Sequence, residues 1–122
     1  MTQANYVLLY VDNTTESAAF YTRLLDLQPV ETAPTFALFV QPNGLKLGLW
    51  SRHTALPTPT TAGGGGEIGF HVESRDEVAR LHAHWQALGL TILQAPTEMD
   101  FGYTFVALDP DQHRLRVFAL SI

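Results

Sequence analysis

The chain has 122 residues, of which 46% are hydrophobic and none is a cysteine, and its formal net charge is −5. This length and composition fit one globular domain with a core of its own. They exclude a disulfide scaffold and a cysteine nucleophile, they disfavour nucleic acid as a partner, and no apolar run is long enough to span a membrane.

The first predicted elements are a strand and a helix. Residues 6–11 form a β-branched and aromatic run, which indicates a buried strand. Asn13, followed three residues later by Glu16, is a capping-box pattern that predicts the start of a helix. Apolar residues then recur at helical spacing, at Phe20, Leu24 and Leu27. Pro29 indicates that the helix has ended by that point.

A hairpin and a linker complete the first half. Two strands are predicted over about 35–41 and 45–52, because Pro42-Asn43-Gly44 between them is a strong turn sequence. Residues 53–66 hold two prolines, four threonines and four consecutive glycines. Such a composition forms neither helix nor strand, so we expect a flexible linker there.

The second half repeats this order. A strand is predicted over 67–72, and Ser74 with Glu77 is a second capping box. The helix stripe consists of Val78, Leu81, Trp85 and Leu88, and Gly89 is a helix stop. Further strands are predicted over 91–93, 103–108 and 115–120, with a turn at 109–112.

The two halves align with an offset of about 61 residues, which indicates an internal βαβββ repeat. The sequence therefore predicts an α+β fold in a single domain over 1–122. Its modules span about 1–52 and 67–122, and the linker at 53–66 joins them.

Two short motifs carry a resemblance to a known family. The segment 20–25, Phe-Tyr-Thr-Arg-Leu-Leu, is similar to its FY…LG motif, with Asp26 where glycine is usual. The segment 109–111, Asp-Pro-Asp, is similar to its DPDG turn, with Gln112 replacing glycine. The chain thus resembles the glyoxalase/bleomycin-resistance/extradiol dioxygenase (vicinal oxygen chelate) superfamily. The resemblance implies two βαβββ modules whose curled mixed sheets surround a cup, usually completed by a second subunit.

The resemblance also locates the positions where metal-dependent relatives carry histidine or glutamate ligands. Strand alternation assigns them here to Tyr6, Gly48, Glu67 and Arg116. Only Glu67 is an ordinary ligand for a divalent metal, because glycine has no side chain and arginine stays protonated. We therefore expect no metal, no other cofactor and no catalytic residue at these positions.

Aromatic side chains surround the lost ligands. Tyr6, Tyr10 and Trp50 are expected to face the cup, and the missing side chain at Gly48 is expected to leave space beside Trp50. His71 should face the cup as well. Glu67 and Arg116 either pair with each other or bind polar groups of a ligand. One of Phe36 and Phe39, and one of Phe101 and Tyr103, can join this set, and the sequence does not decide which.

Within the superfamily, three segments look like a phenazine antibiotic-resistance protein: 49–51, 67–69 and 101–105. This resemblance implies non-catalytic binding and sequestration of a planar aromatic small molecule such as a phenazine, with Trp50 stacking on it. It also implies a homodimer. The N-terminus shows no signal peptide and the chain has no cysteine, so we expect a cytoplasmic protein. The alternatives are a metal-dependent glyoxalase- or dioxygenase-type enzyme and a binder of bleomycin-type glycopeptides.

Overall fold

The computed structural model describes residues 1–61 and 63–121. The chain forms two compact units, Met1–Ala62 and Gly63–Ile122. The boundary between them falls inside the segment 53–66. Each unit has its own sheet and its own helix.

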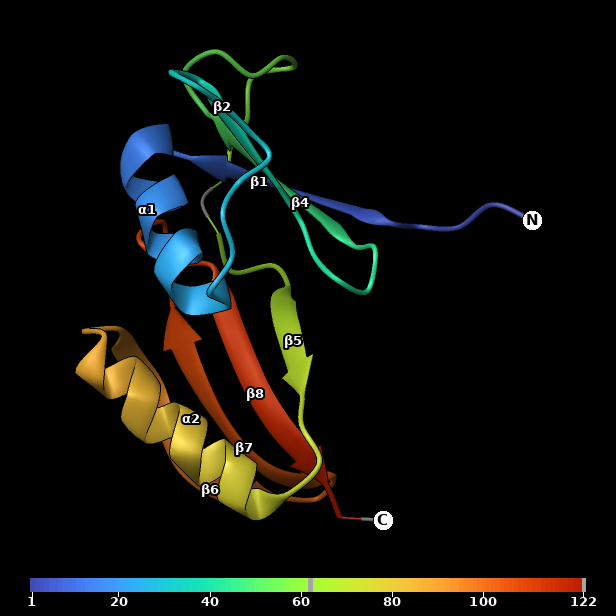
Figure 1. Ribbon diagram of the computed structural model, residues 1–122, viewed down its shortest axis with the longest axis vertical. Coiled ribbons are helices and arrows are strands. Elements are labelled where there is room, and N and C mark those ends of the chain that lie inside the picture. Colours follow the sequence, from blue (N-terminus) through green and yellow to red (C-terminus); the bar gives the residue numbers. More distant parts are fainter. Residues whose placement is uncertain (62, 122) are drawn as a thin grey trace. The chain divides into compact units, whose positions relative to one another are not determined.

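Unit 1 consists of one helix and a four-stranded mixed sheet (Figure 1). Its elements are β1 (Tyr6–Val11), α1 (Thr14–Leu25), β2 (Glu31–Ala33), β3 (Phe36–Val40) and β4 (Lys46–Ser51). The strand order is β1-β4-β3-β2, with β1 parallel to β4 and the other pairs antiparallel. The parallel pair is possible because α1 and the β2–β3 hairpin provide the long crossover between β1 and β4.

Unit 2 repeats this arrangement. Its elements are β5 (Glu67–His71), α2 (Arg75–Ala87), β6 (Thr91–Met99), β7 (Gly102–Leu108) and β8 (Arg114–Leu120). The strand order is β5-β8-β7-β6, and β5 is again parallel to β8. In Figure 1, α2 lies along one face of this sheet. The predicted α+β fold of two βαβββ modules is confirmed, and both sheets are open.

Two strands differ from the sequence prediction. β6 continues to Met99, although the predicted strand ended at residue 93. Pro96 explains the early stop, since proline weakens a strand prediction, but β6 is an edge strand, where proline is tolerated. Register shifts between β6 and β7 accompany it. β2 was not predicted from its residues, because three exposed positions give no apolar pattern.

The helix ends follow the predicted capping patterns. The Asn13 side chain accepts a hydrogen bond from the Glu16 amide at 3.0 Å, and the Ser74 side chain accepts one from the Glu77 amide at 3.1 Å. Gly89 has a φ of 90°, a left-handed conformation that suits a residue after a helix end. Neither helix of the described residues is long and apolar enough to cross a membrane.

Each unit buries the apolar side of its sheet. In unit 1, Val11, Phe39 and Leu49 are fully buried with Tyr21 of α1. In unit 2 the buried set includes Trp85 of α2, whose ring meets Phe105 edge-on at a centroid distance of 5.3 Å. The buried side chains of unit 2 are Val78, Trp85, Phe105, Val106, Ala107, Leu115, Val117 and Ala119. Val106 pairs with Arg116 and therefore lies on the other face of this sheet, where it is fully buried as well.

Asp26 shows why glycine is usual at this position of the motif that the segment 20–25 resembles. It caps α1 with φ 50° and ψ 51°, a left-handed conformation that costs a non-glycine residue about 1 kcal/mol. Its negative charge also opposes the helix dipole at this end. We expect Asp26→Gly to stabilise the protein by about 0.5–1 kcal/mol in urea unfolding, because the gain exceeds the extra freedom of unfolded glycine. Asp26→Asn should recover only the charge contribution, and a destabilised glycine variant would contradict this explanation.

Candidate functional site

The sheet of unit 1 presents an aromatic face on the side away from its buried core. Tyr6, Leu8 and Tyr10 alternate with the less exposed positions of β1 and are 45%, 38% and 38% exposed. The parallel register places Tyr6 beside Lys46, Leu8 beside Gly48, and Tyr10 beside Trp50. We call this surface the unit 1 open face, made of Tyr6, Leu8, Tyr10, Phe36, Gly48 and Trp50. The predicted orientation of its tyrosines follows from this alternation.

The space above Gly48 is already filled. A β-carbon at this position would lie 2.7 Å from Leu8 Cδ1 and 3.0 Å from Tyr6 Cε1. The expected gap beside Trp50 is therefore absent, because these two side chains from β1 lie over the glycine. Gly48 is buried by them and permits their close approach. Leu8 was not among the predicted site residues, although its position two residues from Tyr6 and Tyr10 indicates the same face.

Tyr10 and Trp50 form the edge of the aromatic surface. Their ring centroids lie 6.3 Å apart with an interplanar angle of 44°, so the rings are tilted and do not stack flat on each other. Phe36 pairs with Trp50 across β3 and β4 and lies on the same face. Phe39 is fully buried on the other side. The structure thus resolves the choice between the two phenylalanines in favour of Phe36.

In unit 2, Glu67 and Arg116 form a two-pronged ion pair. Arg116 Nε donates to Glu67 Oε1 at 2.7 Å, and its Nη2 donates to Oε2 at 3.0 Å. The hydrogen bond from Arg116, with the charges of Arg116 and Arg114, holds the pKa of Glu67 below its ordinary value, against the opposing effect of burial. Glu67 is therefore ionised at neutral pH, and it forms a bidentate, charge-assisted ion pair with Arg116.

Two further side chains fix the orientation of Arg116. Its Nη1 donates to Thr104 Oγ1 at 3.2 Å and, at a longer 3.4 Å, toward Gln94 Oε1. Thr104 is fully buried, and its hydroxyl donates to the backbone carbonyl of Val117 at 2.8 Å. The sequence did not single out Thr104 or Gln94. They lie on β7 and β6, and only the strand register brings them to Arg116.

An aromatic group lies beside this ion pair. His71 stacks on Phe118 at a centroid distance of 5.2 Å with an interplanar angle of 9°. Phe101 meets Phe118 edge-on at 6.3 Å, and the Arg116 guanidinium lies 6.0 Å from the Phe101 ring. Tyr103, the alternative to Phe101, instead contacts Arg75 of α2. We call this side of the sheet the unit 2 open face, made of Glu67, His71, Phe101, Arg114, Arg116 and Phe118, with the fully buried Thr104 bonded to Arg116.

The residues at the family's metal positions do not fit a metal ion. Both oxygens of Glu67 are held by arginine, and a guanidinium repels a cation. Tyr6 and Gly48 add one phenol and no second carboxylate. Within residues 1–61 and 63–121, no three histidine, aspartate or glutamate side chains gather closely enough to hold a metal ion. A divalent site usually needs three such ligands.

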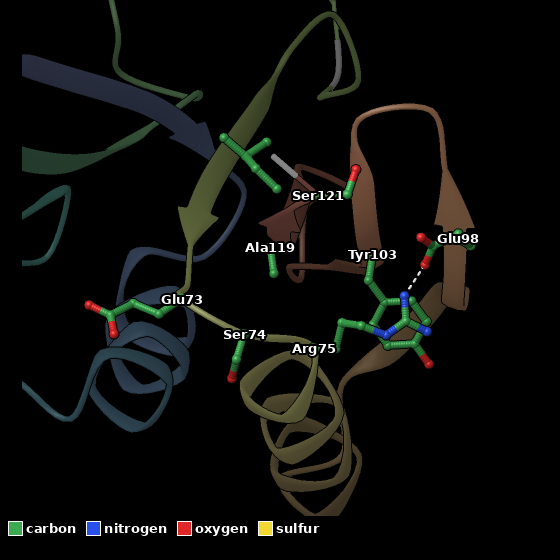
Figure 2. A pocket seen from close by; sticks show the side chains of 8 residues that line it. Glu73, Ser74, Arg75, Glu98, Tyr103, Ala119 and Ser121 are labelled. Atoms are coloured by element: carbon green, nitrogen blue, oxygen red, sulfur yellow. Dashed lines mark hydrogen bonds and ion pairs between the residues drawn. The ribbon is translucent and has the colours of Figure 1, made fainter.

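A separate cavity of about 310 Å³ opens at the start of α2 (Figure 2). The Arg75 guanidinium lies 4.1 Å from the Tyr103 ring centroid and pairs with Glu98. Figure 2 shows these three side chains grouped at one side of the cavity, with Ser74 and Glu73 lining another. Tyr103, the alternative to Phe101, lines this cavity, whereas none of the seven main predicted site residues does, and its arginine already has a partner.

Residues 3–117 match the family model of the Glyoxalase/Bleomycin resistance protein/Dioxygenase superfamily. The chain belongs to this superfamily. The match extends over both units, which agrees with the repeated βαβββ topology.

Individual relatives cover nearly all of the chain. The solution NMR structure of protein ATC0852 from Agrobacterium tumefaciens is 53% identical, with full coverage of both chains and a TM-score of 0.92. A glyoxalase-related enzyme from Fulvimarina pelagi has the same fold at 23% identity, with a TM-score of 0.85 over 98% of this chain and 88% of its own. The phenazine antibiotic resistance protein EhpR of Enterobacter agglomerans is 27% identical over 96% of this chain and 92% of its own.

Proposed function

We propose that this protein binds and sequesters a planar aromatic small molecule, with phenazine-type antibiotics as the candidate ligands, and does not transform it. The observation that carries the proposal is the unit 1 open face, where Tyr6 and Tyr10 stay exposed and Tyr10 lies next to Trp50. The relationship to a phenazine antibiotic resistance protein supports the same ligand class.

Exposed aromatic rings on a rigid sheet suit a flat ligand for a physical reason. Each good aromatic contact contributes about 0.5–1.5 kcal/mol beyond the burial of apolar area. The tilt of 44° between Tyr10 and Trp50 leaves their ring faces unsatisfied by each other. A planar ligand that covers the Trp50 ring would bury apolar surface on both molecules.

The proposed contacts are the seven residues predicted from the sequence. Trp50, Tyr6 and Tyr10 supply ring faces, and Gly48 permits the packing of Tyr6. In unit 2, the proposed ligand contacts are the polar side chains of Glu67, Arg116 and His71. That the protein is a homodimer, holds no metal and works in the cytoplasm belongs to the same proposal.

Tryptophan fluorescence tests the proposal, because the chain has two tryptophans in different surroundings. Trp85 is only 2% exposed and packs against Phe70 and Phe105, so it serves as an internal reference. Titration with phenazine should quench Trp50 and leave Trp85 largely unchanged. In Trp50→Phe the saturable quenching should disappear. In Trp50→Ala the affinity measured by calorimetry should fall at least about tenfold, as expected for loss of a central aromatic contact.

Val30→Ala is the matched control, since Val30 is 64% exposed and precedes β2, which forms the opposite edge of the sheet from β1. It should bind phenazine like the unmodified protein. Equal quenching of the unmodified protein and Trp50→Phe would count against the proposal. A stoichiometric divalent metal in the purified protein would favour the metal-dependent enzyme instead.

A further inference from the structure

The unit 2 open face carries an unbalanced positive charge. Glu67 is the acidic partner of two arginines: Arg116 forms the bidentate pair, and Arg114 Nε lies 3.0 Å from Glu67 Oε2. Two guanidinium groups and one carboxylate leave a local net charge of +1. The chain as a whole has a charge of −5, so this excess is a local feature of β8 and β5. Charges close to a bound ligand affect its binding more strongly than charges elsewhere on the protein, because salt screens the more distant charges.

Arg114 and Arg116 differ in how their donors are used. Arg116 donates to Glu67, Thr104 and Gln94, so its guanidinium is fully engaged and fixed. Arg114 Nε lies 3.0 Å from Glu67 Oε2, and this carboxylate is its ion-pair partner. Its side chain is 38% exposed. A guanidinium has five N–H donors, so the exposed part of Arg114 can bind a further acceptor such as a ligand carboxylate.

The two arginines of β8 are followed on the same face of the strand by an aromatic side chain. Arg114, Arg116 and Phe118 occupy alternate positions of β8 and therefore point to one face. At about 3.3 Å per residue, the row from Arg114 to Phe118 spans about 13 Å. This length accommodates a fused multi-ring molecule with an acidic substituent. The parallel stack of His71 on Phe118 provides the ring surface at its far end.

We infer that the unit 2 open face selects an aromatic acid, with Arg114 as the residue that binds the ligand carboxylate and Glu67 as the residue that binds and orients both arginines. The inference rests on the proposed function and narrows its ligand class from planar aromatic molecules to their carboxylates. Arg114 acts as the specificity-determining residue, and Arg116 keeps Glu67 in place.

A matched pair of ligands tests the inference: phenazine and phenazine-1-carboxylate, titrated by calorimetry at pH 7.5. The unmodified protein should bind the carboxylate at least about tenfold more tightly, because it gains one charge-assisted hydrogen bond. In Arg114→Gln this preference should be lost, while the affinity for phenazine itself should stay within about twofold, because the ring contacts are retained. Arg114→Lys keeps the charge without the planar fork and should retain part of the preference.

Arg80→Gln is the control for charge, because Arg80 lies on α2, is 62% exposed and pairs with Glu77. It removes the same charge as Arg114→Gln and should leave both affinities unchanged. If Arg114→Gln does not fold, the preference of the unmodified protein should still decline as salt is raised. Equal binding of both ligands by the unmodified protein overturns the inference and leaves the proposed function intact. Binding of neither ligand overturns both.

Discussion

Replacing Gly102 with alanine should destabilise the protein by at least about 3 kcal/mol, more than any substitution at the aromatic faces. Gly102 begins β7 and pairs with Leu120 at the end of β8. A β-carbon at this position would lie 2.0 Å from the carbonyl oxygen of Ala119 and 2.9 Å from Leu120 Cα. Both atoms belong to the backbone, so no side-chain rotation can relieve the contact.

The conformation of Gly102 adds a second cost. Its φ of 149° lies in a region that residues with a side chain rarely adopt, and such strain costs about 1–3 kcal/mol. Overpacking of a well-packed site contributes about 1–3 kcal/mol more. Urea unfolding of Gly102→Ala measures the sum. Gly65→Ala is the control, because a β-carbon there meets nothing within 4 Å, and it should change the stability by less than about 0.5 kcal/mol. Equal stability of the two variants would contradict the argument.

The sequence could not reveal this role of Gly102. The segment Phe101-Gly102-Tyr103 indicates that the glycine precedes a strand, and the predicted strand began at Tyr103. What makes it necessary is the approach of β8, whose residues 119 and 120 come close only after the β7–β8 hairpin has formed. Contacts between distant segments of this kind leave no periodic pattern.

Most of the fold was predictable because local signals and packing agree. The runs at β1 and β5 have the β-branched and aromatic composition of strands, and Asn13 and Ser74 cap the helices in the predicted way. The failures lie where the local signal is weak. β2 has only exposed residues, and β6 contains Pro96 on the edge of its sheet.

The sequence predicted which face of the sheet each site residue lies on, but it did not predict how their side chains pack. Alternation correctly indicates that Tyr6 and Tyr10 lie on one face and that Glu67 and Arg116 lie on another. It cannot indicate how far a side chain reaches. Leu8 and Tyr6 therefore occupy space that was expected to be open at Gly48. For the same reason the use of both Glu67 oxygens by arginine emerges only from the side-chain geometry.

Replacing Asp109 with alanine should cost about 2–4 kcal/mol, because this carboxylate organises the turn before β8. Its side chain is fully buried. Oδ1 accepts hydrogen bonds from the amides of Asp111 and His113 at 2.8 and 2.9 Å, and Oδ2 lies 2.7 Å from His113 Nδ1. Alanine would leave two amides and the imidazole without this acceptor.

Asparagine at position 109 should be much milder, at about 1 kcal/mol, because its oxygen can still accept from both amides and His113 can present its unprotonated nitrogen to the new amide group. His113→Ala removes only the ring contact and serves as the control, and hydrogen exchange at the amides of residues 111 and 113 reports the turn directly. Because the turn fixes where β8 begins, Asp109→Ala should also displace Arg114 relative to Glu67 and weaken any preference for a carboxylate ligand. Loss of stability with an unchanged preference would separate the turn from the site. If Asp109→Ala is no less stable than His113→Ala, the contribution of Asp109 comes from its contact with the His113 ring. The two hydrogen bonds from the backbone amides would then contribute nothing further.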